Sequence, residues 1–120
     1  MPAEGIHLTA LREALAGPSL GVSARRRIVR HEDAARLGAL LVDLPYFDHY
    51  LGEVARYATG RAARPSPWGA ILHEGGAIAL LTALLDGARA EPEPTMGAVA
   101  LGLASHLAID RALHPLVNAL

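Results

Sequence analysis

The chain has 120 residues, a net charge of −1 and no cysteine. This length is typical of one domain, and the near-zero charge gives no bulk electrostatic attraction to nucleic acid or to an anionic membrane. Without cysteine there is no disulfide framework, so a metal ion would have to be bound by histidine and carboxylate side chains. Hydrophobic residues make up 52% of the chain, which excludes intrinsic disorder. We therefore expect a single domain over residues 1–120.

The composition predicts an all-α fold. Alanine and leucine, both strong helix formers, supply 44 residues, whereas the β-branched valine, isoleucine and threonine total 15. Apolar periodicity and the positions of glycine and proline predict a compact bundle of about five helices. In chain order they are Ile6–Ala16, Asp33–Val42, Tyr46–Thr59, Trp68–Leu85 and Met96–Leu113, with Ser23–Arg30 as a short basic turn or helix.

Two stretches are apolar enough to be considered as membrane spans. Gly69–Leu85 contains His73 and Glu74, and Met96–Ile109 contains His106, so neither offers about 18 uninterrupted apolar residues. We interpret both as buried helices rather than transmembrane segments. The N-terminal residues contain no basic region followed by an apolar run, so we expect no signal peptide and a cytoplasmic protein.

The predicted C-terminal helix, Met96–Leu113, is apolar nearly all round, which predicts that it is buried on most sides. It nevertheless contains His106 and Asp110, with His114 following at the same spacing. Residues four apart share one face of a helix, and a buried carboxylate is costly unless it is paired or bound to a metal. Two interpretations remain open: a hydrogen-bonded His106–Asp110 pair, or two adjacent metal ligands. Pro115 is expected to end or kink the helix at His114.

Three further polar residues have unusual positions. His73 lies among apolar residues of a predicted helix, beside Gly75-Gly76; alone it would be interpreted as a hydrogen-bonded core histidine. Asp43 precedes Leu-Pro45 at a predicted helix end, where a turn aspartate is equally expected. His7 lies at the start of the first helix and, taken alone, would be an exposed terminal histidine.

Taken together, these residues resemble a known family. The order His7, Asp43-Leu-Pro-Tyr-Phe, Leu72-His73 and His106-x3-Asp110-x3-His114-Pro115 is similar to that of the bacterial zinc-dependent phospholipase C domain, a relative of the S1/P1 nucleases. The resemblance extends from His7 to Asn118. It implies an all-helical fold with a cluster of up to three zinc ions that hydrolyses phosphate esters.

The resemblance also implies a set of ligands. Asp43, His73, His106 and Asp110 resemble the ligands of one zinc ion, and Asp110 resembles the carboxylate that bridges to a second zinc ion with His7. His114 resembles the first ligand of a third zinc ion. The family completes that third site with a His-x3-Glu pair on a further helix, and no such pair follows His114. We therefore expect an incomplete third site, in a fragment of a phospholipase C-like domain, in a degenerate domain, or in a protein that completes the site from a partner subunit.

The leading interpretation is a zinc-dependent phosphoesterase whose substrate is a phosphate ester, with lipid esters included, and in which Asp43 takes a proton from water or holds the metal. The alternative is a non-catalytic helical domain with a structural or vestigial metal site, serving as a partner-binding module. The basic run Arg25-Arg26-Arg27 lacks a nucleic-acid motif, so no specific nucleic acid is expected. The surface that the absent helix would cover predicts a homo-oligomer.

Overall fold

The computed structural model describes residues 3–64, 66–90 and 94–120. All regular structure in these ranges is helical, without strands, which confirms the all-α prediction. In chain order the elements are α1 (Ala3–Ala16), α2 (Val22–Arg30), α3 (Glu32–Leu40), the 3-10 turn η1 (Leu44–Phe47), α4 (Tyr50–Ala58), α5 (Pro67–Ile71), the π-turn η2 (Leu72–Gly76), α6 (Ala77–Ala90) and α7 (Pro94–Ala119).

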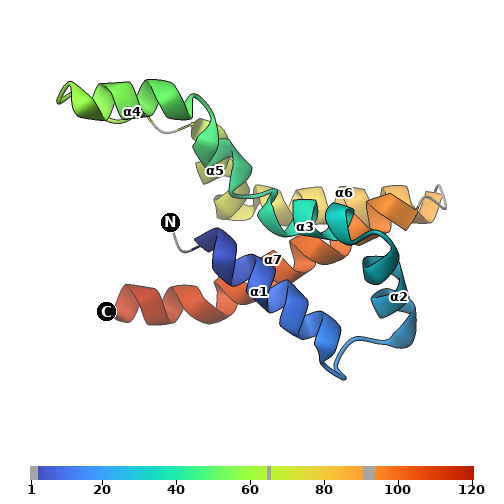
Figure 1. Ribbon diagram of the computed structural model, residues 1–120. Helices are drawn as coiled ribbons and strands as arrows, with labels where there is room; N and C mark the ends of the chain where they lie inside the picture. The colour runs from blue at the N-terminus through green and yellow to red at the C-terminus, as the bar shows by residue number, and fades with distance from the viewer. Residues whose placement is uncertain (1–2, 65, 91–93) are drawn as a thin grey trace.

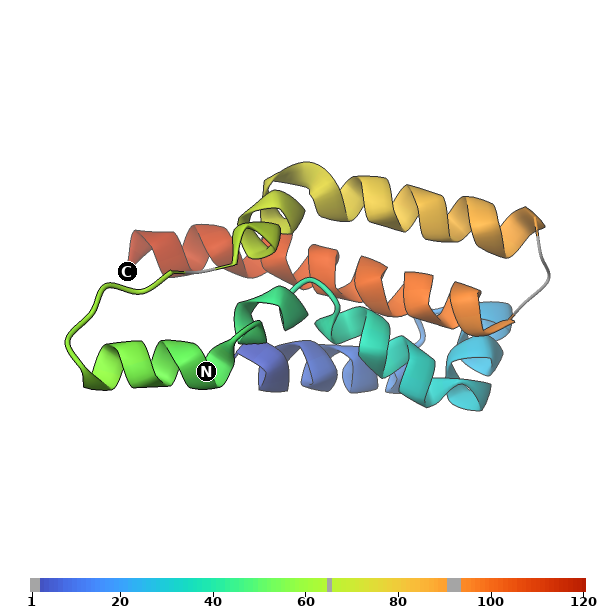
Figure 2. The same cartoon turned by 90° about the horizontal axis from the view of Figure 1, so that it is seen from above.

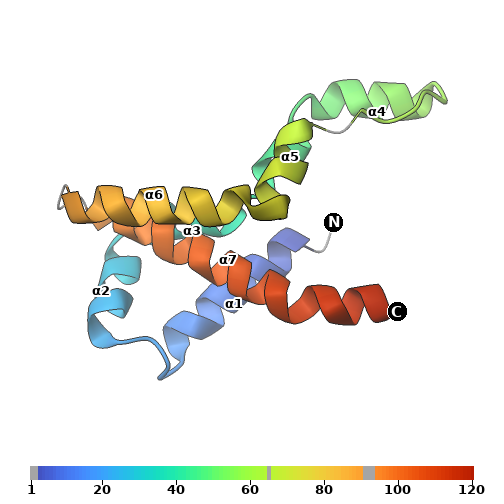
Figure 3. The same cartoon turned by 180° about the vertical axis from the view of Figure 1, so that it is seen from behind.

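Helix α7 is the centre of the arrangement. It lies between α6 on one side and α1 and α3 on the other, and α2 closes one end (Figure 1 and Figure 2). Helices α5 and α6 are joined through η2 into one bent rod. Helix α4 projects away from this assembly, as the view from behind also shows (Figure 3).

The closest packing joins α3 to α7, and two glycines make it possible. A Cβ atom on Gly102 would lie 1.9 Å from the carbonyl oxygen of Ala35, and one on Gly38 would lie 2.1 Å from that of Val99. Only residues without a side chain allow the two backbones to approach this closely. The backbone of α3 is therefore within reach of side chains on α7.

Two small apolar clusters form the core. One contains Leu11, Ile28, Ala35, Ala39 and Ala98, and joins α1, α2, α3 and α7. The other contains Val42, Ala77 and Leu103, and joins the end of α3 to α6 and α7. The second cluster lies directly beneath the site described below, because Val42 precedes Asp43 and Leu103 is one turn before His106.

The predicted burial of the C-terminal helix is not confirmed. The buried residues of α7 lie between Gly97 and His106, and Leu116 and Val117 are each 63% exposed. The helix extends past its neighbours, so its last part, from His114 onward, is exposed (Figure 1). The bundle is also less compact than predicted: its radius of gyration is 16.0 Å, against about 13.6 Å for a compact chain of this length.

The expected buried helix Gly69–Leu85 is also corrected by the structure. Within Pro67–Ala90 the residues Ile71 and Ile78 are 49% and 59% exposed, because α6 contacts α7 along one side only. Two helical stretches are long and apolar enough to cross a membrane, by length and composition only: Pro67–Ala90 and Pro94–Ala119. Core helices of soluble proteins pass the same test, so this finding alone does not place the chain in a bilayer.

Several helix boundaries differ from those predicted, two of them by a change in the backbone path. The expected helix Tyr46–Thr59 is divided by His49, whose φ of 55° is left-handed, into η1 and α4. Pro115 was expected to end or kink the helix at His114; the helix does not end there, because Pro115 lies inside α7. A proline removes one backbone hydrogen bond, and in this exposed last part of the helix water can satisfy the freed carbonyl.

Candidate metal centre

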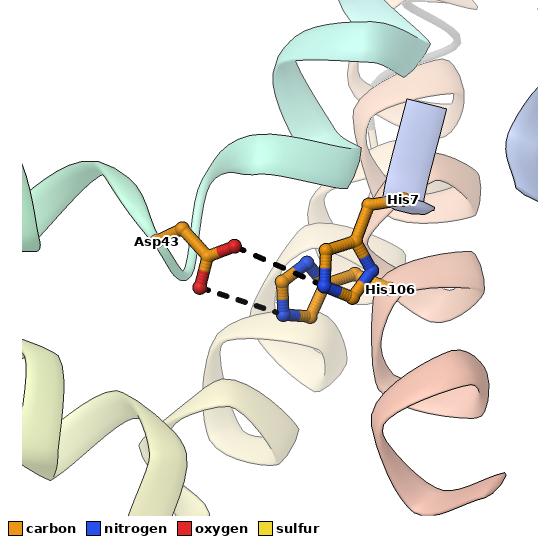
Figure 4. A group of neighbouring side chains, drawn as sticks. All are labelled: His7, Asp43 and His106. Carbon is orange, nitrogen blue, oxygen red and sulfur yellow. Dashed lines mark ion pairs between the residues drawn. The ribbon is translucent and has the colours of Figure 1, made fainter. Parts of the chain in front are cut away.

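The structure brings together all six residues singled out as candidate ligands. They come from four separate parts of the chain: His7 from α1, Asp43 from the junction of α3 and η1, His73 from the π-turn η2, and His106, Asp110 and His114 from α7. Figure 4 shows Asp43 facing the rings of His7 and His106. Their convergence requires α1, α3, α7 and the bent α5–α6 rod to pack as described above.

Four atoms define an inner cage at the centre of this cluster. His106 Nε2 lies 3.1 Å from Asp110 Oδ2 and 4.0 Å from Asp43 Oδ1. His73 Nε2 lies 3.4 Å from Asp43 Oδ1 and 4.0 Å from Asp110 Oδ2. Zinc binds nitrogen and oxygen at about 2.0–2.2 Å, which places tetrahedral ligand atoms about 3.3–3.6 Å apart. Two of the four distances, 3.1 and 3.4 Å, are close to this spacing and the other two, at 4.0 Å, are wider, so the cage is somewhat more open than a closed tetrahedral zinc site.

The remaining carboxylate oxygens face a second, outer set of groups. His7 Nε2 lies 3.4 Å from Asp110 Oδ1 and 3.8 Å from Asp43 Oδ2, and His114 Nε2 lies 3.5 Å from Asp110 Oδ1. Both aspartates thus direct one oxygen into the inner cage and the other outward, which is the geometry of carboxylates that bridge two ions. The ring of His7 stacks on that of His106, with centroids 3.7 Å apart.

Backbone carbonyls orient the two inner histidines. His106 Nδ1 donates to the carbonyl oxygen of Ala39 at 2.7 Å, and His73 Nδ1 donates to that of Gly69 at 2.8 Å. A carbonyl oxygen only accepts, so each Nδ1 carries the proton and each Nε2 is directed at the carboxylates. Metal-binding histidines typically use their second nitrogen in this way, which sets the tautomer and the aim of the ring.

Several buried polar atoms of the cluster have no hydrogen-bond partner. They are His106 Nε2, Asp43 Oδ2 and His7 Nδ1. The imidazole of His106 is fully buried and that of His7 is 4% exposed, so water does not readily serve these atoms. An unpaired buried donor or acceptor costs about 1–3 kcal/mol. A cation between the imidazoles and the carboxylates would remove this cost at His106 and Asp43, so the residues present fit a metal ion.

The environment of His7 differs from the one predicted. His7 is buried, not an exposed terminal histidine, because α1 packs against both α3 and α7. Burial lowers the pKa of His7 below its usual value, and the neighbouring His106 lowers it further. Asp110 and Asp43 raise this pKa, but by less, so the net shift is downward. His7 is therefore neutral at pH 7, the form in which imidazole binds metals.

A local irregularity of the backbone positions His73. Within η2, Glu74 and Gly75 leave helical geometry, Gly75 with a φ of 122°, and this kink bends the α5–α6 rod beside the histidine. The Gly75-Gly76 pair supplied the sequence signal, since only glycine adopts this φ without strain.

Tyr46 is a member of the site to which sequence reasoning assigned no role. Its hydroxyl lies 3.3 Å from His73 Nδ1, and its ring lies against Gly69, where a Cβ would be only 2.6 Å from Tyr46 Cε1. Burial and the charge of Asp43 raise the pKa of Tyr46 above 10.0, so the phenol keeps its proton. The Leu-Pro-Tyr-Phe segment after Asp43 and the glycine four residues before His73 were the available signals.

A shallow cavity of about 300 Å³ opens onto the cluster. Its lining combines two ligand histidines and Asp110 with the apolar side chains of Val42 and Leu107, and the cation Arg111. The cavity gives solvent and small molecules access to the outer side of the site, where His114 is 59% exposed.

No protein-family model, curated protein or solved structure matches the chain.

Proposed function

We propose that this protein is a metal-dependent hydrolase of phosphate esters, similar to phospholipase C, with zinc as its metal. The observation that carries the proposal is the inner cage, in which two imidazoles held by backbone carbonyls face two carboxylates at N···O distances of 3.1 to 4.0 Å. Buried charges of one sign placed this closely are costly unless a cation accompanies them.

His73, His106, Asp43 and Asp110 would hold the first ion. His7 and the outer oxygens of both aspartates would hold a second ion, with His114 alongside. Because Nδ1 of His106 is bound to a carbonyl, its single free nitrogen serves one ion only. Zinc in such a site supplies Lewis-acid activation of water and neutralises the charge that develops on phosphate oxygens.

The protein's own groups would then orient the reaction. Asp43 Oδ2 is buried and has no hydrogen-bond partner among the described residues, so with the first ion alone bound it is available to accept the proton of an attacking water. Arg111, at the cavity mouth, places a permanent positive charge where a phosphate group would enter. The apolar walls at Val42 and Leu107 limit the water that reaches the site.

Metal analysis of protein purified without a histidine tag tests the proposal. We expect about one to two zinc ions per chain and hydrolysis of bis(p-nitrophenyl) phosphate that disappears with EDTA and returns with zinc. His49→Ala is the matched control, because this histidine is exposed and outside the cluster. Metal-free protein that binds no added zinc would contradict the proposal.

One observation favours a non-catalytic alternative. His106 Nε2 and Asp110 Oδ2 are 3.1 Å apart, so a protonated His106 would form an ion pair with Asp110 without any metal. In that case the cluster is a structural feature of a partner-binding domain. Bound zinc without hydrolysis of any phosphate ester would favour a structural metal site, whereas absence of zinc would favour the ion pair.

A further inference from the structure

All five aromatic residues of the chain lie on one part of the structure. They are Tyr46, Phe47, Tyr50, Tyr57 and Trp68, with exposed fractions from 37% to 86%. Aromatic side chains usually dominate a core because each buries about 150–250 Å². Here the core is built from aliphatic residues instead. We call residues 44–64 together with Trp68 the aromatic arm; its helix α4 projects from the molecule (Figure 1 and Figure 3).

Helix α4 turns its apolar side to solvent. Leu51 is 80% exposed and Tyr57 is 86% exposed, and together with Tyr50 and Val54 they span an arc of about 120° around the helix. An amphipathic helix of a soluble protein normally buries this side. The exposed area therefore indicates a surface that another body covers.

The polar side of α4 is occupied by the arm's own chain. Arg56 donates two hydrogen bonds to the carbonyl oxygen of Ala62, at 3.0 and 2.9 Å, and the backbone N–H of Arg64 donates to Glu53 at 2.9 Å. These contacts brace the returning segment against the helix. The arm is thus an ordered projection. Its apolar side faces outward because the returning segment occupies the polar side.

We propose that the aromatic arm docks the protein on an anionic lipid surface. Tyrosine and tryptophan favour the headgroup region of a bilayer, where the ring is partly buried and its polar tip stays hydrated. The arm carries three arginines against two carboxylates although the whole chain has a net charge of −1. Neither the guanidinium of Arg61 nor that of Arg64 has a carboxylate partner among the described residues, so both groups are available to lipid phosphates.

The arm is continuous with the candidate metal centre. It begins directly after Asp43, and Trp68 lies little more than one turn before His73. The hydroxyl of Tyr46, on the arm, lies 3.3 Å from His73 Nδ1. Docking would therefore bring the metal centre close to the phosphate groups of the surface. The docking itself does not depend on the phosphoesterase chemistry, and it is tested without metal.

Trp68 provides a built-in probe, since it is the only tryptophan and is 62% exposed. Metal-free protein is mixed with vesicles of phosphatidylcholine, with or without phosphatidylglycerol. We expect the Trp68 emission to shift to shorter wavelength, and the protein to float with the vesicles, more strongly when phosphatidylglycerol is present. Leu51→Glu/Tyr57→Glu should weaken binding at least tenfold. Arg61→Gln and Arg64→Gln should each weaken it about fivefold at low salt.

Val22→Glu is the matched control, because Val22 is an apolar side chain of α2 with 68% exposure, outside the arm. It should bind vesicles like the wild type, and circular dichroism should show equal helix content in all variants. Absence of binding, or equal loss in the control and the arm variants, would overturn the proposal. Self-association abolished by Leu51→Glu/Tyr57→Glu, without vesicle binding, would overturn it in favour of a second copy.

Discussion

The imidazole of His106 donates its Nδ1 proton to the carbonyl oxygen of Ala39 at 2.7 Å, across the crossing of α3 and α7. This contact connects helix packing to the candidate metal centre. It exists because Gly38 and Gly102 let the two backbones approach closely. The same contact directs the other nitrogen of His106 at Asp110, so a change in the helix crossing would also change the metal site.

Gly102→Ala tests this connection. The added Cβ would meet the carbonyl oxygen of Ala35 at 1.9 Å, so the helices must separate. We expect a loss of about 2 kcal/mol or more in the free energy of unfolding, measured by urea denaturation, together with weaker zinc binding. Gly5→Ala is the control, because a Cβ there meets nothing within 4 Å. Equal stability of the two variants would show that the close crossing is not required.

The second prediction ranks the candidate ligands by how much zinc affinity is lost when each is replaced by alanine. His106→Ala and Asp110→Ala remove members of the inner cage, and each should weaken zinc binding by more than about 100-fold, since even outer partners of ligands are worth 10–100-fold. His114→Ala should weaken it less than about tenfold, because His114 is 59% exposed and contacts only the outer oxygen of Asp110. Isothermal titration calorimetry of metal-free protein with zinc measures all three. A larger loss for His114→Ala would place the principal ion in the outer set.

The sequence predicted some parts of this site by local rules and others only by resemblance. Helical periodicity placed His106 and Asp110 on one face, and α7 carries them there. No local pattern indicates that Asp43 and His73 reach the same point, because that depends on how the helices pack. Only the family resemblance grouped them. The exposed last part of α7 was missed because its apolar composition resembles that of a buried helix, and the arm because the pattern predicted one continuous helix over Tyr46–Thr59.

Chelation provides a third prediction. Removing a bound ion leaves Asp43 and Asp110 close together, without a counter-charge, beside partly buried imidazoles. A ligand at about 1,000 times its dissociation constant stabilises the folded state by about 4 kcal/mol, which for this size corresponds to roughly 10–15 °C in Tm. We expect EDTA to lower the Tm by about this amount, and added zinc to restore it. A Tm unaffected by EDTA in zinc-loaded protein would contradict the prediction.

The fourth prediction concerns pH and His7 in the metal-free protein. Burial, aided by the neighbouring His106, lowers the pKa of His7 below the value of 6.5 expected for an unfolded chain. As the pH falls below 6.5, the unfolded chain therefore binds a proton that the folded protein does not, and the stability decreases until the lowered pKa is reached. Above that window His7 is neutral in both states and contributes no pH dependence. For one proton, the slope is at most about 1.4 kcal/mol per pH unit. Urea denaturation in EDTA at a series of pH values should show this slope in the wild type and a smaller one in His7→Gln, which cannot titrate. Parallel curves for the two proteins would show that His7 is not the group responsible.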